Sequence, residues 1–251
     1  MKHRLALVSY LNTKPFIEGL NKFFPDGELD LELLPPAECP KELANGTCDM
    51  ALIPVGSLPD FADLSILKDH CIGAQGAVDS VFLFSQVPVQ EVDKVILDLH
   101  SRTSNGLTRI LMQHFWKRKV DFQVPDSRDF DLIQGNTAGV AIGDVAYKIK
   151  DRYNYVYDLS EEWMSYTGLP FVFAVWAYIG ERWATQDLQR MVHALEWGRV
   201  HRKEAAQKWG GQFGYSPEEA ERYLCESIRY RLDQPKHQAL ERYITELKAL
   251  D

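Results

Sequence analysis

The chain has 251 residues and a formal net charge of −8, with 45% hydrophobic and 25% charged residues. This composition is typical of a globular protein with a real core and excludes a disordered or fibrous chain. The acidic balance disfavours general binding to nucleic acid or to anionic membranes, so an anionic ligand would have to be held by local geometry.

Targeting and redox signals indicate a cytoplasmic protein. The longest apolar run, residues 169–179, is too short for a membrane-spanning helix, which needs about 20 residues. The apolar part of the N-terminal stretch is also shorter than the roughly 7–15 residues of a signal peptide. We expect free thiols and no metal, because no CxxC pair or zinc-like Cys/His spacing occurs around Cys39, Cys48, Cys71 and Cys225.

The first 56 residues alternate between strand and helix patterns. Apolar or alternating runs predict strands at 4–10, 29–35 and 49–55, and amphipathic segments predict helices at about 15–24 and 37–46. The order β-α-β-α-β is typical of a parallel α/β sheet.

A second α/β unit is predicted in the middle of the chain. Its strands are expected in the second half of 71–89 and at 94–99, 120–124, 138–144 and 155–159. The stretch "SRTSNG" (101–106) precedes an amphipathic helix that we place at 106–117, with apolar residues three and four positions apart.

After residue 179 the pattern predicts helices to the end of the chain. Ser216, Pro217 and Glu219 form a capping box with proline at the first helical position, which marks the start of one helix. A last helix is expected at about 235–250. Two crossover strands near 75–90 and 169–179 then predict two lobes, one formed by 1–85 plus 175–251 and the other by 86–174.

Small polar residues follow the predicted strands. In open α/β folds, ligands bind at the carboxyl ends of strands. The candidates are Ser9, Tyr10, Asn12 and Thr13; Ser80; Ser101, Arg102, Thr103, Ser104 and Asn105; and Gly143 with Asp144.

The hydroxyl cluster predicts an anion site. Ser101, Thr103 and Ser104 directly precede a helix, whose N-terminal N–H groups and dipole favour carboxylates or phosphates. Each hydroxyl alone could be only the N-cap, but three within four residues exceed what one cap requires.

Several candidates also have a purely structural interpretation. Asn12 could be a helix cap or an Asx-turn residue, and Asp144 could cap the helix that follows it. Phe171 and Phe173 could belong to the core, or one ring could line the cleft. Among the histidines, only His100 lies near a predicted strand end.

Common catalytic motifs are absent from the sequence. It has no P-loop, HExxH or GxSxG, the spacing of "GAQGAV" (73–78) is not that of a dinucleotide fingerprint, and no paired carboxylates stand at the predicted strand ends. An enzyme with these residues would work mainly by orienting its substrate and by stabilising charge with neutral donors.

Five blocks in order resemble a known family. The blocks "VSYLNTKPF", "DMALIPVGSL", "VDSVFLFS", "DLHSRTSNGLTRIL" and "GLPFVFAVWA", between residues 8 and 177, are similar to MqnA, the chorismate dehydratases of the futalosine pathway of menaquinone biosynthesis. The resemblance implies a two-lobed type II periplasmic-binding-protein fold with a cleft between the lobes, followed by C-terminal helices.

The resemblance also implies a reaction and a site. The reaction removes water from chorismate, a dicarboxylate, to give 3-[(1-carboxyvinyl)oxy]benzoate, without metal or cofactor. Asn12 would lie next to the reacting ring, and Ser80 with Ser101–Asn105 would hold carboxylates. Gly168–Phe173 would form a hinge and pocket wall, and Ser9, Tyr10, Gly143, Asp144 and Phe171 complete the predicted substrate site.

Other functions remain possible at this point. The related naphthoate synthase of the same pathway (MqnD) shares the fold, although "SYLN" points away from it. A cytosolic solute-binding module for a small carboxylate, or a fold relative that acts on another carboxylate, would share the strand-end pattern. One hypothesis for the dehydratase is that a substrate carboxylate accepts the proton, and the sequence leaves the oligomeric state open.

Overall fold

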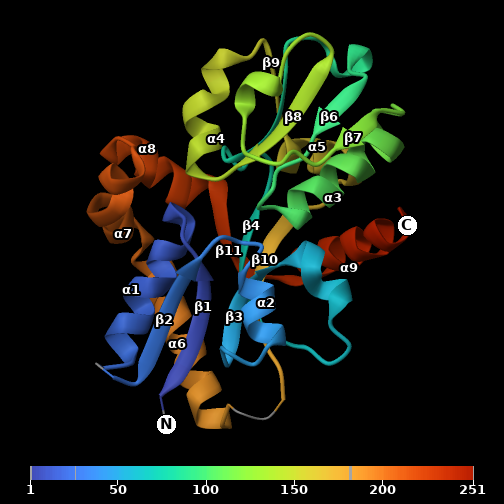
Figure 1. Ribbon diagram of the computed structural model, residues 1–251. Helices are drawn as coiled ribbons and strands as arrows, with labels where there is room; N and C mark the ends of the chain where they lie inside the picture. The colour runs from blue at the N-terminus through green and yellow to red at the C-terminus, as the bar shows by residue number, and fades with distance from the viewer. Residues whose placement is uncertain (1, 26, 181–182, 251) are drawn as a thin grey trace. The chain divides into compact units, whose positions relative to one another are not determined.

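Two β-sheets organise the chain, and each belongs to a different unit (Figure 1). The computed structural model describes residues 2–25, 27–180 and 183–250. One unit consists of Met1–Gly73 and Val172–Gln234, and the other of Ala74–Phe171 and Pro235–Asp251. We refer to them as the first unit and the second unit.

The first unit is built on a six-stranded sheet. Its strand order is β11-β4-β10-β3-β1-β2, in which β1 pairs in parallel with β2 and β3, and β10 pairs antiparallel with β3. The predicted β-α-β-α-β start is confirmed. The strands are β1 (His3–Val8), β2 (Leu29–Leu34), β3 (Met50–Pro54), β4 (Ser65–Ala74), β10 (Phe171–Tyr178) and β11 (Ile228–Leu232), and the helices are α1 (Lys14–Phe23), α2 (Cys39–Ala44), α6 (Thr185–Val200), α7 (Arg202–Trp209) and α8 (Pro217–Arg222).

Helices α1 and α6 pack with almost no space between their backbones. A Cβ atom at Gly19 would collide with the carbonyl group of Ala194, and a Cβ atom at Gly198 would collide with the carbonyl group of Pro15. Both glycines are therefore required by close backbone approach and not by a turn. This contact fixes the start of α1, where the conspicuous "SYLNTKPF" stretch ends.

The second unit has a five-stranded sheet of order β7-β6-β8-β5-β9. Strand β6 pairs in parallel with β7 and β8, whereas β5 is antiparallel to β8 and β9. Its core includes Phe82, Phe84, Ile133, Ala141 and Tyr153. The strands are β5 (Val81–Ser85), β6 (Lys94–Ile96), β7 (Asp121–Gln123), β8 (Thr137–Ile142) and β9 (Tyr155–Asp158), and the helices are α3 (Arg102–Ile110), α4 (Asp144–Ile149), α5 (Leu159–Thr167) and α9 (Gln234–Lys248).

The unit boundaries differ from the predicted 1–85 plus 175–251 and 86–174. Residues 81–85 form β5, which is the strand between β8 and β9, so this segment belongs to the second unit. Helix α9 belongs there too, because the Tyr243 hydroxyl donates to the carbonyl of Thr103 over 3.0 Å and its ring packs edge-on against Phe171 and Trp163. The last helix follows a segment of the first unit in the chain but packs in the second unit, and the order of elements in the sequence does not indicate this.

The prediction of helices from residue 180 onward was wrong at one place. The capping box of Ser216 and Glu219 is confirmed at the start of α8, but residues 228–232 form strand β11. Their sequence, "IRYRL", alternates apolar and charged residues, and Ile228, Tyr230 and Leu232 are buried. This period of two indicates a strand.

Among the described residues, no helix has both the length and the apolar character needed to cross a bilayer.

Candidate functional site

In the first unit, the candidate residues form the connection between β1 and α1. Ser9 is exposed, Tyr10 is half-buried, and Leu11–Thr13 form a single 3₁₀ turn that leads into α1. The Thr13 hydroxyl lies 2.7 Å from the carbonyl oxygen of Val8 and 2.8 Å from that of Tyr10. Pro15 occupies the first turn of α1, as predicted. These hydrogen bonds hold the connection against the end of β1.

Asn12 is not a helix cap. Tyr10 and Thr13 are the N-cap residues of the two helical segments, and neither cap involves a side-chain hydrogen bond. Instead, the Asn12 amide donates to the hydroxyl of Tyr223 over 3.1 Å, and the Tyr230 hydroxyl donates to the backbone carbonyl of Asn12 over 2.9 Å. Asn12 is only 9% exposed. The side-chain amide is thus oriented by one hydrogen bond, and the backbone of the same residue is held by another.

The two tyrosines are buried and come from the C-terminal region of the chain. Tyr223 begins a π-helical turn, Tyr223–Ser227, and its ring stacks on Tyr215 with the centroids 5.6 Å apart. Tyr230 lies on β11. Burial raises the pKa of Tyr230 well above its usual value near 10, so its hydroxyl is a neutral donor at physiological pH. Tyr230 therefore supplies a hydrogen bond to Asn12 without adding charge.

Lys14 is a residue of this stretch that the sequence reasoning missed. It is 7% exposed, and its ammonium group lies 4.8 Å from the ring centre of Trp209 and 5.3 Å from that of Phe213. Two aromatic faces stabilise such a cation where water is scarce. A lysine within an otherwise buried run of residues is the sequence signal that could have identified it.

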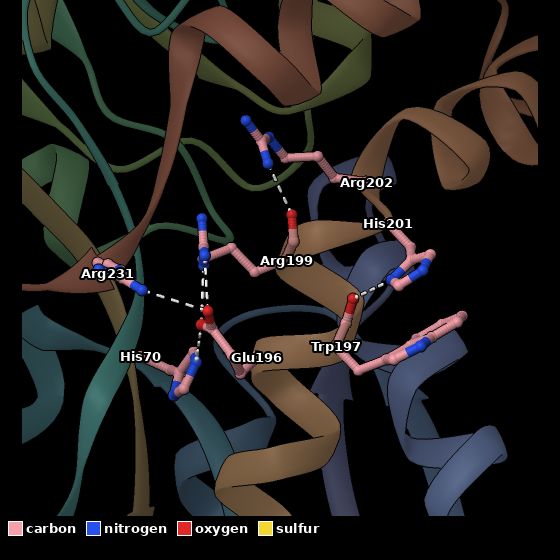
Figure 2. A network of polar contacts seen from close by, with 7 residues as sticks. All are labelled: His70, Glu196, Trp197, Arg199, His201, Arg202 and Arg231. Atoms are coloured by element: carbon pink, nitrogen blue, oxygen red, sulfur yellow. Dashed lines mark hydrogen bonds and ion pairs between the residues drawn. The ribbon is translucent and has the colours of Figure 1, made fainter.

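A network of acidic and basic side chains in the first unit neutralises its own charges (Figure 2). The Glu196 carboxylate on α6 accepts hydrogen bonds from Arg199 at 2.8 and 2.6 Å, from Arg231 at 3.2 Å and lies 3.3 Å from His70. The Arg199 guanidinium holds the pKa of Glu196 at about 2. Burial lowers the pKa of His70. With so low a pKa, the Glu196 carboxylate is a poor acceptor for a substrate proton near pH 7.

In the second unit, most of the predicted site residues lie along one edge of the sheet. The Gly143 N–H donates to the Ser80 carbonyl over 2.8 Å, and the register pairs Val81 with Ile142 and Phe82 with Asp158. Because β6 runs parallel to β8, the Ser101 loop after β6 follows the same edge as Gly143. The structure thus brings Ser80, Gly143, Asp144 and the Ser101–Asn105 segment to one side.

Ser101 is the N-cap of α3, as the structural alternative predicted. Its hydroxyl oxygen accepts the Ser104 N–H at 3.0 Å and lies 2.8 Å from the Ser104 hydroxyl. The Asn105 side chain contacts both the N–H and the carbonyl of Asp98, at 2.9 and 2.8 Å, and so shapes the loop before the helix. Ser101, Thr103 and Ser104 are all at least 95% buried. Helix α3 begins four residues earlier than predicted, so Thr103 and Ser104 lie in its first turn.

Two side chains of this edge were missed by the sequence reasoning. The Asp158 carboxylate accepts backbone N–H groups of Val78, Asp79, Ser160 and Glu161 at 2.8 to 3.3 Å, which fixes the segment that carries Ser80. Burial raises the pKa of Asp158 to about 7, although these N–H groups act in the opposite direction. A strand pattern that ends in an aspartate, with Ser160 and Glu161 close behind it, is typical of a helix N-cap, and this signal could have identified Asp158.

Arg128 is the second missed residue. Its guanidinium donates to Asp98 at 3.1 and 2.6 Å and to the carbonyl of Ile142 at 3.1 Å. The Asp98 carboxylate is fully buried, and its other oxygen accepts the N–H of His100. Arg128 therefore ties the ends of β6 and β8 together, and His100 contributes its backbone to this arrangement. No motif in the sequence marks this arginine.

Two further candidates have structural contacts. Phe171 is 1% exposed and packs edge-on against Trp163 and Tyr243, which agrees with its interpretation as a core residue. Asp144 is in the first turn of α4, after Gly143 with φ 75°, and Gly143 occupies the N-cap position. A carboxylate in this position is favoured by the helix dipole. Among the described residues, no group of three or more His, Cys, Asp or Glu could hold a metal ion.

Known structures share the fold of this chain. A protein from Archaeoglobus fulgidus matches with a TM-score of 0.77 and 15% identity over 99% of this chain and 97% of that one. The Candida albicans CA3427 gene product is described as having the generic periplasmic binding protein fold. It matches with a TM-score of 0.68 and 13% identity over 99% of this chain and 90% of that one. The periplasmic aliphatic sulphonate binding protein SsuA from Escherichia coli matches with a TM-score of 0.67 and 14% identity over 99% of this chain and 86% of that one. The predicted periplasmic-binding-protein fold is confirmed.

Sequence comparison gives the family. A chorismate dehydratase from Thermus thermophilus is 28% identical over 225 residues, which cover 83% of each protein. The family described as "Menaquinone biosynthesis" matches residues 3–249. Since this match extends over nearly the whole chain, the protein belongs to the menaquinone biosynthesis family.

Proposed function

We propose that the protein is a chorismate dehydratase, which converts chorismate to 3-[(1-carboxyvinyl)oxy]benzoate and water in the futalosine pathway. The family match and the Thermus thermophilus relative support this function. Such an enzyme is a carbon–oxygen lyase. A cytoplasmic location is part of the proposal and is consistent with four cysteines that form no disulfide with one another.

The second unit offers groups suited to a carboxylate. Helix α3 begins with backbone N–H groups and the hydroxyls of Thr103 and Ser104 in its first turn, and Ser80 lies along the same sheet edge. These groups bind an anion without adding net charge, because the helix dipole and the N–H groups supply the attraction. We propose that they hold one carboxylate of chorismate, together with Gly143.

The first unit offers the group that we place beside the reacting ring. Asn12 is buried, and its amide is oriented by Tyr223 while its backbone is held by Tyr230. This single observation carries our assignment, since a fixed neutral amide is what is needed to orient a ring and to stabilise charge as it develops. We include Ser9 and Tyr10, which precede it, in the same part of the site.

The chemistry requires little from the protein beyond orientation. The ring hydroxyl leaves with the electrons of its C–O bond, a ring proton is removed, and the electrons of the C–H bond complete the aromatic ring. The proton and the hydroxide leave as water. We propose that a substrate carboxylate accepts the proton and that Asn12 stabilises the departing hydroxyl by hydrogen bonding.

Purified protein mixed with chorismate, without added cofactor, tests this function. We expect the chorismate absorbance to disappear while one aromatic product forms with a mass lower by one water. Saturable binding without turnover would instead indicate a solute-binding module, a role favoured only by the shared fold. The absence of both binding and turnover would point to another small carboxylate as the substrate.

A further inference from the structure

A groove on the second unit contains four cationic side chains. Its volume is about 500 Å³, and it is lined by Arg109, Lys117, Arg118, Lys119 and Phe122, among others. This volume is within the range of sites for small organic ligands, roughly 300 to 1,000 Å³. Four cations around one groove are unexpected in a chain with a net charge of −8.

The cations of this groove are poorly neutralised. No ion pair involves Arg109, Lys117 or Lys119 among the residues that the structure describes, and Arg109 instead lies over the ring of Phe122 at 4.4 Å. Arg118 is 3.8 Å from the exposed Asp93 carboxylate and 3.2 Å from the Val92 carbonyl. Its buried Nε has no acceptor. An unpartnered buried N–H is costly even though the Arg118 side chain as a whole is 32% exposed, so an anion that accepts from this Nε would be stabilised.

The backbone around the groove has two unusual features. Residues Leu111–Phe115 form a π-helical turn that extends α3, and such turns occur frequently at functional sites. Lys117 then adopts a left-handed conformation with φ 56°, which is uncommon for a lysine. The Arg118 N–H donates to the carbonyl of Met112 over 2.7 Å. Together these features fold the Lys117–Lys119 segment back against the end of the helix.

Cations at the end of a helix also have a structural role. They interact favourably with the helix dipole, which equals about half a negative charge at this end. One cation is enough for that interaction, and the groove has four. The lining also includes the apolar side chains of Met112, Val120 and Leu250, which a purely electrostatic role would not require.

We propose that this groove binds a small organic anion with at least two carboxylate or phosphate groups and a short apolar part. A groove of this volume in an acidic protein suits a small ligand better than a nucleic acid, which requires an extended basic surface. The groove is separate from the proposed carboxylate site, because Arg109 lies roughly 12 Å or more along α3 from Ser101.

Calorimetric titration of the full chain with pyrophosphate and, separately, with citrate tests the proposal. We expect saturable binding of at least one probe, and the comparison shows whether phosphate or carboxylate groups are preferred. The double variant Lys117→Gln/Lys119→Gln should weaken that binding by roughly tenfold or more, because two charge-assisted contacts are lost.

Two control variants show whether binding depends on this groove. Lys68→Gln/Lys148→Gln removes the same charge from exposed positions and should leave binding unchanged. Ser101→Ala/Ser104→Ala alters the proposed carboxylate site and should also leave binding unchanged, whatever its effect on turnover. The proposal is wrong if neither probe binds saturably, or if the groove variant and the exposed-lysine control lose affinity equally.

Discussion

The side-chain amide of Asn12 lies 3.1 Å from the hydroxyl oxygen of Tyr223, a residue 211 positions later in the chain. This hydrogen bond connects the most distinctive N-terminal stretch to the C-terminal helical region within one unit. It gives Asn12 a defined orientation and separates two roles that the sequence could not distinguish. A helix cap would contribute stability, whereas an oriented amide would contribute to turnover.

Replacing Asn12 by alanine should abolish most of the turnover and leave the fold intact. We expect kcat with chorismate to fall by about 100-fold or more, because an oriented donor to developing charge is removed. The measurement is steady-state kinetics together with thermal unfolding. The matched control is Asn21→Ala, an exposed position on α1, which should retain normal turnover. Near-normal turnover of Asn12→Ala would remove it from the proposed mechanism.

Replacing Tyr223 by phenylalanine should affect orientation without removing the reacting amide. The ring can keep its stacking on Tyr215, but the Asn12 amide loses its acceptor. We expect kcat to fall roughly tenfold with a smaller change in KM, since a buried donor without a partner no longer holds one orientation. Tyr155→Phe, at an exposed position, serves as the control. An effect on thermal stability alone, with kcat unchanged, would contradict a positioning role.

The Glu196 network predicts a dependence of stability on pH. The pKa of Glu196 is lowered to about 2 in the folded protein, so the unfolded state binds a proton first as the pH falls. Its contribution to the free energy of unfolding is therefore complete above about pH 4.5 and is lost between pH 4.5 and 2. With a side chain 36% exposed, we discount this contribution to about 1 kcal/mol.

Denaturant unfolding at several pH values between 2 and 7 measures this contribution. Glu196→Gln should show a smaller loss of stability on acidification than the unmodified protein. Glu204→Gln, an exposed position on α7, should follow the unmodified curve. If all three curves have the same slope below pH 4.5, the network in Figure 2 does not contribute in this way.

The contact between α1 and α6 predicts a large steric effect. Gly198→Ala should lower the free energy of unfolding by about 2–4 kcal/mol, because the new methyl group meets the backbone of Pro15 and has no space to move. Gly211→Ala is the matched control, since a Cβ atom there meets no neighbouring atom. Thermal unfolding should show a clear decrease for Gly198→Ala and little change for Gly211→Ala. Equal melting temperatures would show that α1 and α6 can separate at low cost.

Much of the fold follows from local patterns in the sequence. The alternating strands and helices of the first 56 residues and the capping box at Ser216 depend on neighbours in the chain, and both were predicted. Strand β11 was missed because the helical pattern of the preceding residues was extended through "IRYRL". The alternation in that segment was visible, so this error came from interpretation and not from missing information.

The rest of the site depends on contacts between distant residues. Nothing near Asn12 indicates that Tyr223 and Tyr230 will hold it, and nothing near Arg128 indicates that it will join Asp98 to Ile142. Such partners are selected by the tertiary fold, and a single sequence contains no local signal for them. The resemblance of short blocks located Asn12, while its neighbours became visible only in three dimensions.

The hydrogen bonds from Tyr223 and Tyr230 to Asn12 also have a consequence during protein synthesis. A chain that grows from its N-terminus exposes "SYLNTKPF" early, but its two tyrosine partners are made only when about nine-tenths of the 251 residues have been joined. A product truncated before residue 223 would keep the recognisable motif and lack the groups that orient it. The presence of the motif in a fragment is therefore a poor guide to whether that fragment is active.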